Sequence, residues 1–233
     1  MFTVILTMNF PDGLLPEFLL WAANILVVFI IYLAVKTADW RLLRNEGWQS
    51  LFLGTSATLM LLWSIKAGIK PALDFHILGA TLLGLMFGWQ FALMALSLVL
   101  LGITAFGMAG WQSLGLNFML MGIIPVLFSY NFFRWVERKL PNHFFIYVYV
   151  ASFASAALAI TLCGVAAILV LSLGGVYTGH YLIENYLPYF ILMAWSEALL
   201  TGMAVTMMAV YRPVWLVTFS DKRYLNNEDD NKD

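Results

Sequence analysis

The sequence has few charged residues. Only 11% of its 233 residues are Asp, Glu, Lys or Arg, whereas 62% are hydrophobic. Soluble domains carry about a quarter of charged residues, so this chain would expose more apolar surface than water tolerates. The composition excludes a soluble globular protein and predicts that the lipid bilayer surrounds most of the chain. The formal net charge of −1 points neither toward nor away from nucleic acid, and we expect no nucleic-acid partner.

Reactive side chains are also scarce. Cys163 is the single cysteine and lies in an apolar run, so the chain forms no intrachain disulfide and the thiol is interpreted as a packing residue. The sequence contains no phosphate loop, no nucleophile elbow, no HExxH motif and no pair of carboxylates within one apolar segment. We therefore expect neither an enzyme nor a chain that binds ATP.

What the sequence has in excess is apolar length. The run from Phe75 to Gly110, about 36 residues, would make roughly 54 Å of helix, which is too long for one crossing of a ~30 Å hydrocarbon core. We place a tight turn at Gly88-Trp89-Gln90, between two shorter spans. The predicted fold is all-α and integral to the membrane. Its seven transmembrane helices cover residues 14–35, 47–64, 77–88, 91–107, 113–133, 144–176 and 188–210.

The basic residues indicate the orientation. With seven spans, the loops 36–46 and 134–143 share one side of the membrane with the chain from Tyr211 onward. That side carries all of the 12 Lys and Arg residues except Lys66 and Lys70. Because Lys and Arg concentrate on the cytoplasmic side, we expect the N-terminus outside and the C-terminus in the cytoplasm. The expected location is the cell's inner (plasma) membrane, with multiple passes.

The chain divides into one domain and a tail. Residues 1–220 are predicted to form a single polytopic membrane domain, without a repeat or a linker. Residues 1–13 lack a basic segment and a small-residue cleavage site, so we expect no cleaved signal peptide. Residues 221–233 are polar and show no apolar periodicity, which predicts a disordered tail.

A few polar side chains lie beside or inside the apolar spans. His76 precedes the third span, with Asp74 two residues before it; imidazole is a common metal ligand that a carboxylate can orient, and the alternative is a histidine that only solvates a helix end. Glu197 lies in the middle of the last span, where a carboxylate has either a structural or a functional role. Asn117 is expected to make interhelical hydrogen bonds, with Met121 on the same helix face.

Five short segments form an ordered set along the chain. Met8-Asn9-Phe10-Pro11-Asp12-Gly13 comes first, and the others are residues 76–88, 115–122, 196–201 and 211–213. Together they resemble the CbiM/NikM family, the substrate-binding membrane subunits of energy-coupling-factor cobalt and nickel importers. Residues 115–122 match its Gly-x-Asn-x-x-x-Met-Gly segment, and residues 76–88 are similar to its second histidine followed by a small-residue helix ending in Phe-Gly.

The resemblance implies a function. The chain would be the substrate-specific permease subunit of an importer for a divalent transition metal ion of the cobalt and nickel class. It would work with a coupling transmembrane subunit and ATPase subunits, with the metal ion as its substrate. Two alternatives stay open: a transport-inactive structural or assembly membrane protein on the same fold, and a carrier or channel for a small organic solute near Glu197.

The resemblance also implies ligands. In the family, the ion is held in a near-planar nitrogen site by the N-terminal amine, by the amide and imidazole of the second residue, and by a later histidine. The later histidine corresponds to His76, the second residue to Asn9, and the amine to Met8 if the mature chain begins there. Asn9 is an asparagine where the family has a histidine. The polar network expected to support the bundle consists of Asp12, Asn117, Met121 and Glu197.

Overall fold

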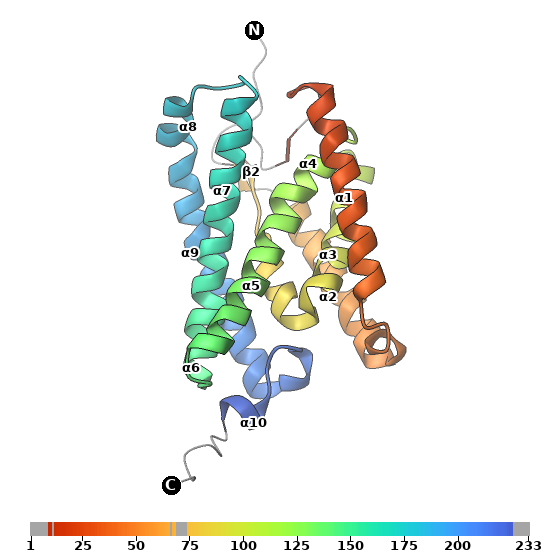
Figure 1. Cartoon of the computed structure of the whole chain (residues 1–233), viewed down its shortest axis with the longest axis vertical. Coiled ribbons are helices and arrows are strands. Elements are labelled where there is room, and N and C mark those ends of the chain that lie inside the picture. Colours follow the sequence, from red (N-terminus) through yellow and green to blue (C-terminus); the bar gives the residue numbers. More distant parts are fainter. Residues whose placement is uncertain (1–8, 11, 66, 69–73, 226–233) are drawn as a thin grey trace.

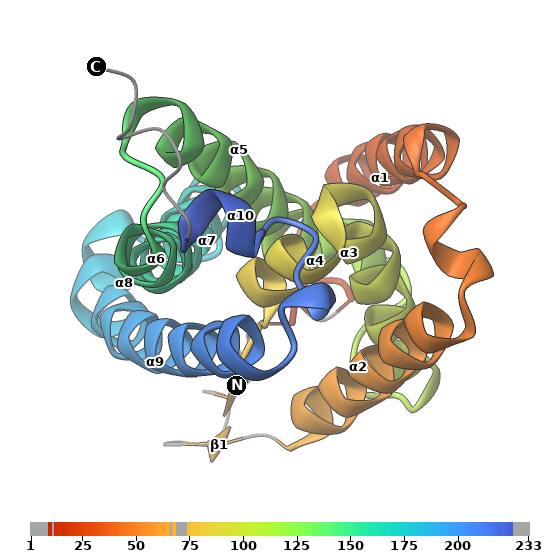
Figure 2. The same cartoon turned by 90° about the horizontal axis from the view of Figure 1, so that it is seen from below.

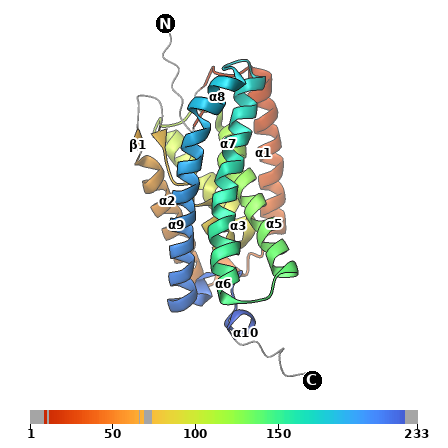
Figure 3. The ribbon, with the colours of Figure 1, turned by 90° about the vertical axis from the view of Figure 1, so that its left-hand side faces the viewer.

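The computed structural model describes residues 9–10, 12–65, 67–68 and 74–225. Its long helices lie side by side and form one bundle (Figures 1 and 3). We call the end where the first helix begins the upper end, and the opposite end the lower end (Figure 1). The elements are α1 (Glu17–Thr37), η1 (Leu42–Arg44), α2 (Glu46–Ser64), β1 (Ala67–Gly68), β2 (Asp74–Phe75), α3 (Ala80–Ala105), α4 (Leu114–Phe118), η2 (Met119–Ile123), α5 (Ile124–Lys139), α6 (Phe144–Ile146), η3 (Tyr147–Ala154), α7 (Ser155–Leu173), α8 (Gly179–Asn185), α9 (Leu187–Tyr211), η4 (Pro213–Trp215) and α10 (Asp221–Tyr224).

The described residues include five helices that are long and apolar enough to cross a membrane. These are Glu17–Thr37, Ala80–Ala105, Leu114–Lys139, Phe144–Leu173 and Leu187–Tyr211. The protein is therefore a multi-pass helical membrane protein. The segment predicted over 144–176 is one continuous helix, as expected. The sequence predicts seven spans, two more than these five helices. The difference arises because the prediction also counts α2, which is rich in serine and threonine, and counts the two halves of α3 separately.

The helix α3 changes direction at Gly88. The backbone angles of Gly88 are φ 77° and ψ 168°, which lie outside the helical region and are accessible essentially to glycine alone. Phe87 and Phe91, on either side of the break, both pack edge-to-face against Phe52 of α2, with ring centroids 5.6 and 6.0 Å apart. The predicted interruption at residues 88–90 is confirmed.

The two halves of α3 return to the same level of α2. A Cβ atom at Gly79, just before the first half, would meet Leu59, and one at Gly102, in the second half, would meet Met60. Because Leu59 and Met60 are consecutive residues of α2, the chain descends through the first half and ascends through the second. We call this arrangement the α3 hairpin; its turn lies at the lower end of the bundle.

The helices differ in how much lipid they face. Of the most apolar part of α1, only 17% of the residues are buried, whereas 56% are buried in α3. The exposed side chains of α1, such as Phe18 and Ile25, are apolar and suit contact with hydrocarbon. The α3 hairpin instead lies within the bundle, with α1, α2, α5, α7 and α9 around it (Figure 2).

The chain after α9 crosses the lower end of the bundle. We call residues 212–225 the C-terminal strap. The backbone N–H of Val217 donates to the carbonyl of Met86 (3.1 Å), and the Thr218 hydroxyl donates to the carbonyl of Leu85 (2.8 Å). These are among the last carbonyls of the first half of α3, which have no partner within their own helix. The strap therefore caps the α3 hairpin.

The strap corrects one expectation about the tail. Residues 221–224 form the short helix α10, and Tyr224 is buried with its ring stacked on Phe219 at a centroid distance of 5.2 Å. The prediction of disorder from residue 221 is therefore wrong for these four residues, because an aromatic anchor outweighs the polar composition around it. Residues 226–233 lie outside the described part of the chain.

Candidate functional site

The N-terminal segment is anchored to the beginning of α4. Asn9 and Phe10 are both buried. The N–H of Phe10 donates to Oδ1 of Asn117 (2.6 Å), and Nδ2 of Asn117 donates to the carbonyl of Phe10 (3.1 Å). A buried backbone group without a partner is costly, and here one side-chain amide satisfies two of them. The amide of Asn117 therefore fixes the position of the chain next to Asn9.

Asp12 and Ser113 extend this anchor. The N–H of Ser113 donates to Oδ1 of Asp12 (2.9 Å), and the Ser113 hydroxyl lies 2.6 Å from the carbonyl of Phe10. Burial acts to raise the pKa of Asp12, but hydrogen bonds from Ser113 and from the backbone of Gln112 and Trp111 outweigh it, so the pKa is lowered from its usual 3.8. The ionised carboxylate is thus the form that holds the turn against the helix start.

His76 lies on the non-helical segment that joins β2 to α3, in the upper part of the bundle. Residues 76–79 follow β2 and are not helical, so the span predicted from residue 77 begins only at Ala80. The side chain of His76 is 4% exposed, and its ring packs on Trp63 of α2 with centroids 4.4 Å apart and planes at 38°. His76 is therefore a buried residue of the bundle, and the alternative of a solvated helix end is wrong.

Glu197 reaches this segment from α9. Its carboxylate accepts hydrogen bonds from the backbone N–H groups of Leu78 and Gly79, 119 and 118 residues earlier in the chain. Glu197 itself is 3% exposed. A carboxylate in a membrane bundle requires partners of this kind, because lipid offers none. These hydrogen bonds link α9 to Leu78 and Gly79, which lie two and three residues after His76.

The predicted polar network is two separate groups. Asp12 and Asn117 join through Ser113 and Phe10, whereas Glu197 contacts the backbone beyond His76. Met121 belongs to the apolar core. Met8 lies outside the described residues, as does the side chain of Asp74. Among the described side chains, no three His, Cys, Asp or Glu residues come together in a way that could hold a metal ion.

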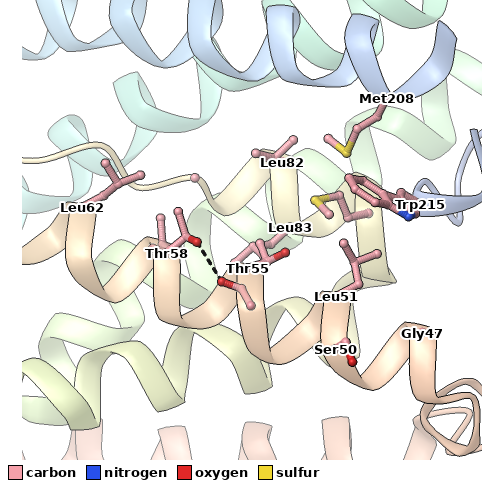
Figure 4. A pocket seen from close by; sticks show the side chains of 14 residues that line it. Gly47, Ser50, Leu51, Thr55, Thr58, Leu62, Leu82, Leu83, Met208 and Trp215 are labelled. Carbon is pink, nitrogen blue, oxygen red and sulfur yellow. Dashed lines mark hydrogen bonds between the residues drawn. The ribbon is translucent and has the colours of Figure 1, made fainter. Parts of the chain in front are cut away.

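A groove on the side of the bundle reaches the same segment. It lies between α2 and α9, over the first half of α3, and has a volume of about 550 Å³ (Figure 4). Trp215 and Met208 line one end, the hydroxyls of Thr55 and Thr58 lie along one wall, and Gly79 forms part of the lining. Gly79, whose N–H donates to Glu197, therefore borders this groove.

Comparison with known proteins assigns the chain to a family. The family model described as the cobalt uptake substrate-specific transmembrane region, CbiM, matches residues 9–215. The chain belongs to the CbiM family. It is a substrate-specific component of a cobalt or transition-metal uptake transporter, with the transition metal as the transported substrate. The resemblance seen in the sequence is thereby confirmed.

Two solved structures share the fold of this CbiM-family chain. One is a crystal structure of a truncated transition metal transporter, 21% identical, with a TM-score of 0.73 over 87% of this chain and 99% of that chain. The other is a crystal structure of a transition metal transporter, 20% identical, with a TM-score of 0.71 over 87% of this chain and 92% of that one. No curated protein matches the sequence.

Two side chains that shape this region of the CbiM-family chain, Ser113 and Trp63, are not among the predicted site residues. Ser113 lies four residues before Asn117, and this spacing, which places both side chains on one helix face, indicates that they can act together. Trp63 gave no such signal, because an aromatic residue near the end of an apolar helix is common at the membrane interface. Only the structure places its ring against His76.

Proposed function

We propose that this CbiM-family subunit captures a divalent ion of the cobalt and nickel class at the upper end of the bundle, with His76 as a ligand. The observation that carries the proposal is the buried imidazole of His76 on a non-helical segment of a membrane protein. Non-helical backbone at membrane depth occurs where it is enclosed by protein or lines a cavity, and transporters place binding sites at such interruptions. Imidazole nitrogen suits both metals.

The anchored N-terminal segment supplies the other proposed ligands. Asn9 is buried next to Phe10, which Asn117 fixes to α4, and α4 lies at the same level of the bundle as β2, the strand directly before His76 (Figure 1). Asn9 offers amide groups, and Met8, outside the described residues, would contribute an amine if the mature chain begins there. Nitrogen ligands of this kind favour cobalt and nickel over magnesium and calcium, which prefer oxygen.

We further propose seven crossings, with the upper end outside and the lower end in the cytoplasm of a cell whose inner membrane holds the protein. The α3 hairpin supports counting its halves separately, and the 19 residues of α2 span about 28 Å as a helix. The basic loops 36–46 and 134–143 lie at the lower end, which agrees with the positive-inside rule. The site then faces the side from which an importer takes its ion.

The chain is proposed to act without enzymatic activity of its own. Membership of the CbiM family places it in a transporter complex, and we propose a coupling transmembrane subunit and ATPase subunits as its partners. The alternative of an organic solute carried past Glu197 has no support, because that carboxylate already accepts two backbone hydrogen bonds.

Thermal unfolding of the purified protein in detergent, with and without Co(II) or Ni(II), tests this function. A free ion concentration of 100 times the Kd adds about 2.7 kcal/mol to the stability of the folded state, which is visible as a raised Tm. We expect the shift in the wild type and in His180→Ala, whose side chain is 83% exposed on α8, but not in His76→Ala. No shift in any of the three proteins would contradict the proposal and favour a transport-inactive member of the fold.

A further inference from the structure

We propose that Glu197 is the positioning residue of the ion site: by holding the backbone of Leu78 and Gly79, it sets the direction in which His76 presents its imidazole. This inference rests on the proposed role of His76 as a ligand. It assigns to a residue on α9, distant in sequence from both proposed ligand segments, control over the geometry of the site without contact to the ion.

Residues 76–79 lack the backbone hydrogen bonds of a helix. In a helix each N–H donates to a carbonyl four residues earlier, but a non-helical segment inside a bundle has no such partner. At Leu78 and Gly79 both N–H groups donate to the carboxylate of Glu197. The acceptor comes from a side chain on another helix, so the path of this segment depends on Glu197.

Gly79 has a left-handed backbone conformation, with φ 64° and ψ 10°. Successive N–H groups next to a left-handed residue point toward one side and form a concave site that favours an anion. A Cβ atom at Gly79 would approach Leu59 to 3.0 Å, so both the space and the backbone angles favour glycine. The segment is therefore shaped to receive the carboxylate.

The imidazole is held from two directions. The ring of His76 packs on Trp63 of α2, while the backbone two residues further on is held by Glu197 of α9. The two restraints act on residues only two positions apart, because Trp63 contacts His76 and Glu197 binds the backbone of Leu78. A shift of the backbone at Leu78 would rotate the ring against Trp63 and change the direction of its nitrogens.

The neighbouring polar side chains of α9 do not provide this acceptor. The hydroxyl of Ser196 is directed to the carbonyl of Leu192 within the helix. Thr201 is buried one turn away, and its hydroxyl oxygen is two bonds closer to the backbone than the carboxylate oxygens of Glu197. The length of Glu197 is what lets its carboxylate reach the non-helical segment.

Two conservative variants of Glu197 show whether the length of its side chain or its negative charge positions His76. Glu197→Gln keeps the length and one carbonyl oxygen, which can accept from both N–H groups, because Oε1 already faces both of them. Glu197→Asp keeps the charge but withdraws the oxygens by one methylene. If Glu197 acts by position, the Gln variant resembles the wild type and the Asp variant does not. If it acts by charge, the order is reversed.

The first readout needs no ion. The chain has three histidines, His76, His143 and His180, so ¹⁵N-histidine-labelled protein in detergent gives three imidazole spin systems. His76→Ala assigns the one that lies against Trp63. We expect Glu197→Asp to shift the His76 signals while those of His143 and His180 stay in place, and Glu197→Gln to leave all three close to the wild type. Unmoved His76 signals in the Asp variant would overturn the inference.

The second readout is binding of Co(II) or Ni(II) by the same proteins. Loss of a group that orients a metal ligand costs about 10- to 100-fold in affinity. We expect that loss for Glu197→Asp, together with a changed visible spectrum of bound Co(II), and no more than a few-fold loss for Glu197→Gln. Equal affinities for wild type and Asp variant would also overturn the inference.

The two readouts keep the proposals apart. If the wild type binds neither ion but Glu197→Asp still shifts His76, the proposed function fails and the positioning of His76 stands. If the wild type binds the ion and the Asp variant binds it equally well, the proposed function stands and the positioning role of Glu197 fails. Glu184→Gln, on the exposed helix α8, serves as the matched control: because Glu184 contacts His180, this variant is expected to move only the His180 signals and to leave the His76 signals and ion binding unchanged.

Discussion

Asn117 pairs its side-chain amide with both backbone groups of Phe10, 107 residues away in sequence. Each of the two hydrogen bonds uses a different end of the amide, so no other side chain of similar size replaces both. The start of the described chain is therefore held by a helix that lies in the middle of the sequence, and the pairing makes a testable contribution to stability.

Asn117→Ala is expected to lower the stability of the protein by about 1–3 kcal/mol, because it leaves the buried N–H of Phe10 without a partner, although the Phe10 carbonyl keeps the Ser113 hydroxyl. Asn117→Asp keeps the acceptor for the Phe10 N–H but turns a second oxygen toward the Phe10 carbonyl at a fully buried position, so it should also destabilise the protein. Thermal unfolding in detergent measures both. The control is Asn131→Ala, since the exposed amide of Asn131 donates only within its own helix, to Leu127. Equal effects at the two positions would contradict the anchor.

The pH dependence of Asp12 follows from its lowered pKa. A carboxylate with a folded-state pKa below its usual 3.8 stabilises the folded state fully above that value, and the contribution is lost as the pH falls through the folded-state pKa. The difference in Tm between the wild type and Asp12→Ala should therefore be constant from about pH 5 to 8 and narrow below about pH 3.8. A difference that widens as the pH falls would show the opposite shift.

The α3 hairpin predicts opposite outcomes for two glycines in one helix. Gly88→Ala forces a side chain into a conformation that costs about 1–3 kcal/mol, although the nearest atom, Oε1 of Gln90, is 3.6 Å away. At Gly84 a Cβ atom meets nothing within 4 Å, and alanine favours the helix. Thermal unfolding should show a loss for Gly88→Ala and none for Gly84→Ala. A tolerated Gly88→Ala would refute the reversal at this residue.

The C-terminal strap allows two interactions to be ranked. Thr218 receives a hydrogen bond from the Tyr147 hydroxyl (2.7 Å) and donates one to the carbonyl of Leu85, so Thr218→Val should cost about 1–2 kcal/mol. Arg223 pairs with Glu137, but the arginine side chain is 49% exposed and Arg134 lies near the same carboxylate, so Arg223→Ala should cost less than about 1 kcal/mol. Unfolding measurements on both variants test the order, and the reverse order would contradict it.

The proposed orientation is open to chemical labelling. With Cys163 replaced by serine, single cysteines are placed by Asn142→Cys in the lower end and by His180→Cys in the upper end, both at exposed positions. A membrane-impermeant maleimide applied to right-side-out membrane vesicles should label His180→Cys and leave Asn142→Cys unlabelled until the membrane is opened. The opposite pattern would invert the topology and place His76 toward the cytoplasm.

Much of the fold was predictable because lipid imposes simple rules. Long apolar runs gave the helices, and the excess length of the run from Phe75 to Gly110 required an interruption, which Gly88 provides. Asp12 and Asn117 are expected in one polar network, and the structure joins them through Ser113. These features depend on local composition or on length, both of which a single sequence displays.

The arrangement around His76 was not predictable in the same way. Glu197 bonds to backbone N–H groups, which every residue except proline carries, so no side-chain pattern marks Leu78 and Gly79 as its partners. The sequence predicts a helix from residue 77 because apolar residues continue through 77 and 78. Over so few positions, hydrophobic periodicity does not distinguish non-helical from helical chain. Tertiary contacts decide such segments.

The capping of the α3 hairpin has a consequence for how the protein is made. Leu85 leaves the ribosome long before Thr218, whose hydroxyl meets its carbonyl 133 residues later. Throughout the synthesis of α5, α7 and α9, the Leu85 carbonyl therefore lacks the hydroxyl from which it accepts in the finished bundle. The hairpin is capped only once the C-terminal strap has been made, and a chain stopped after α9 would have all the long helices but no cap on the hairpin.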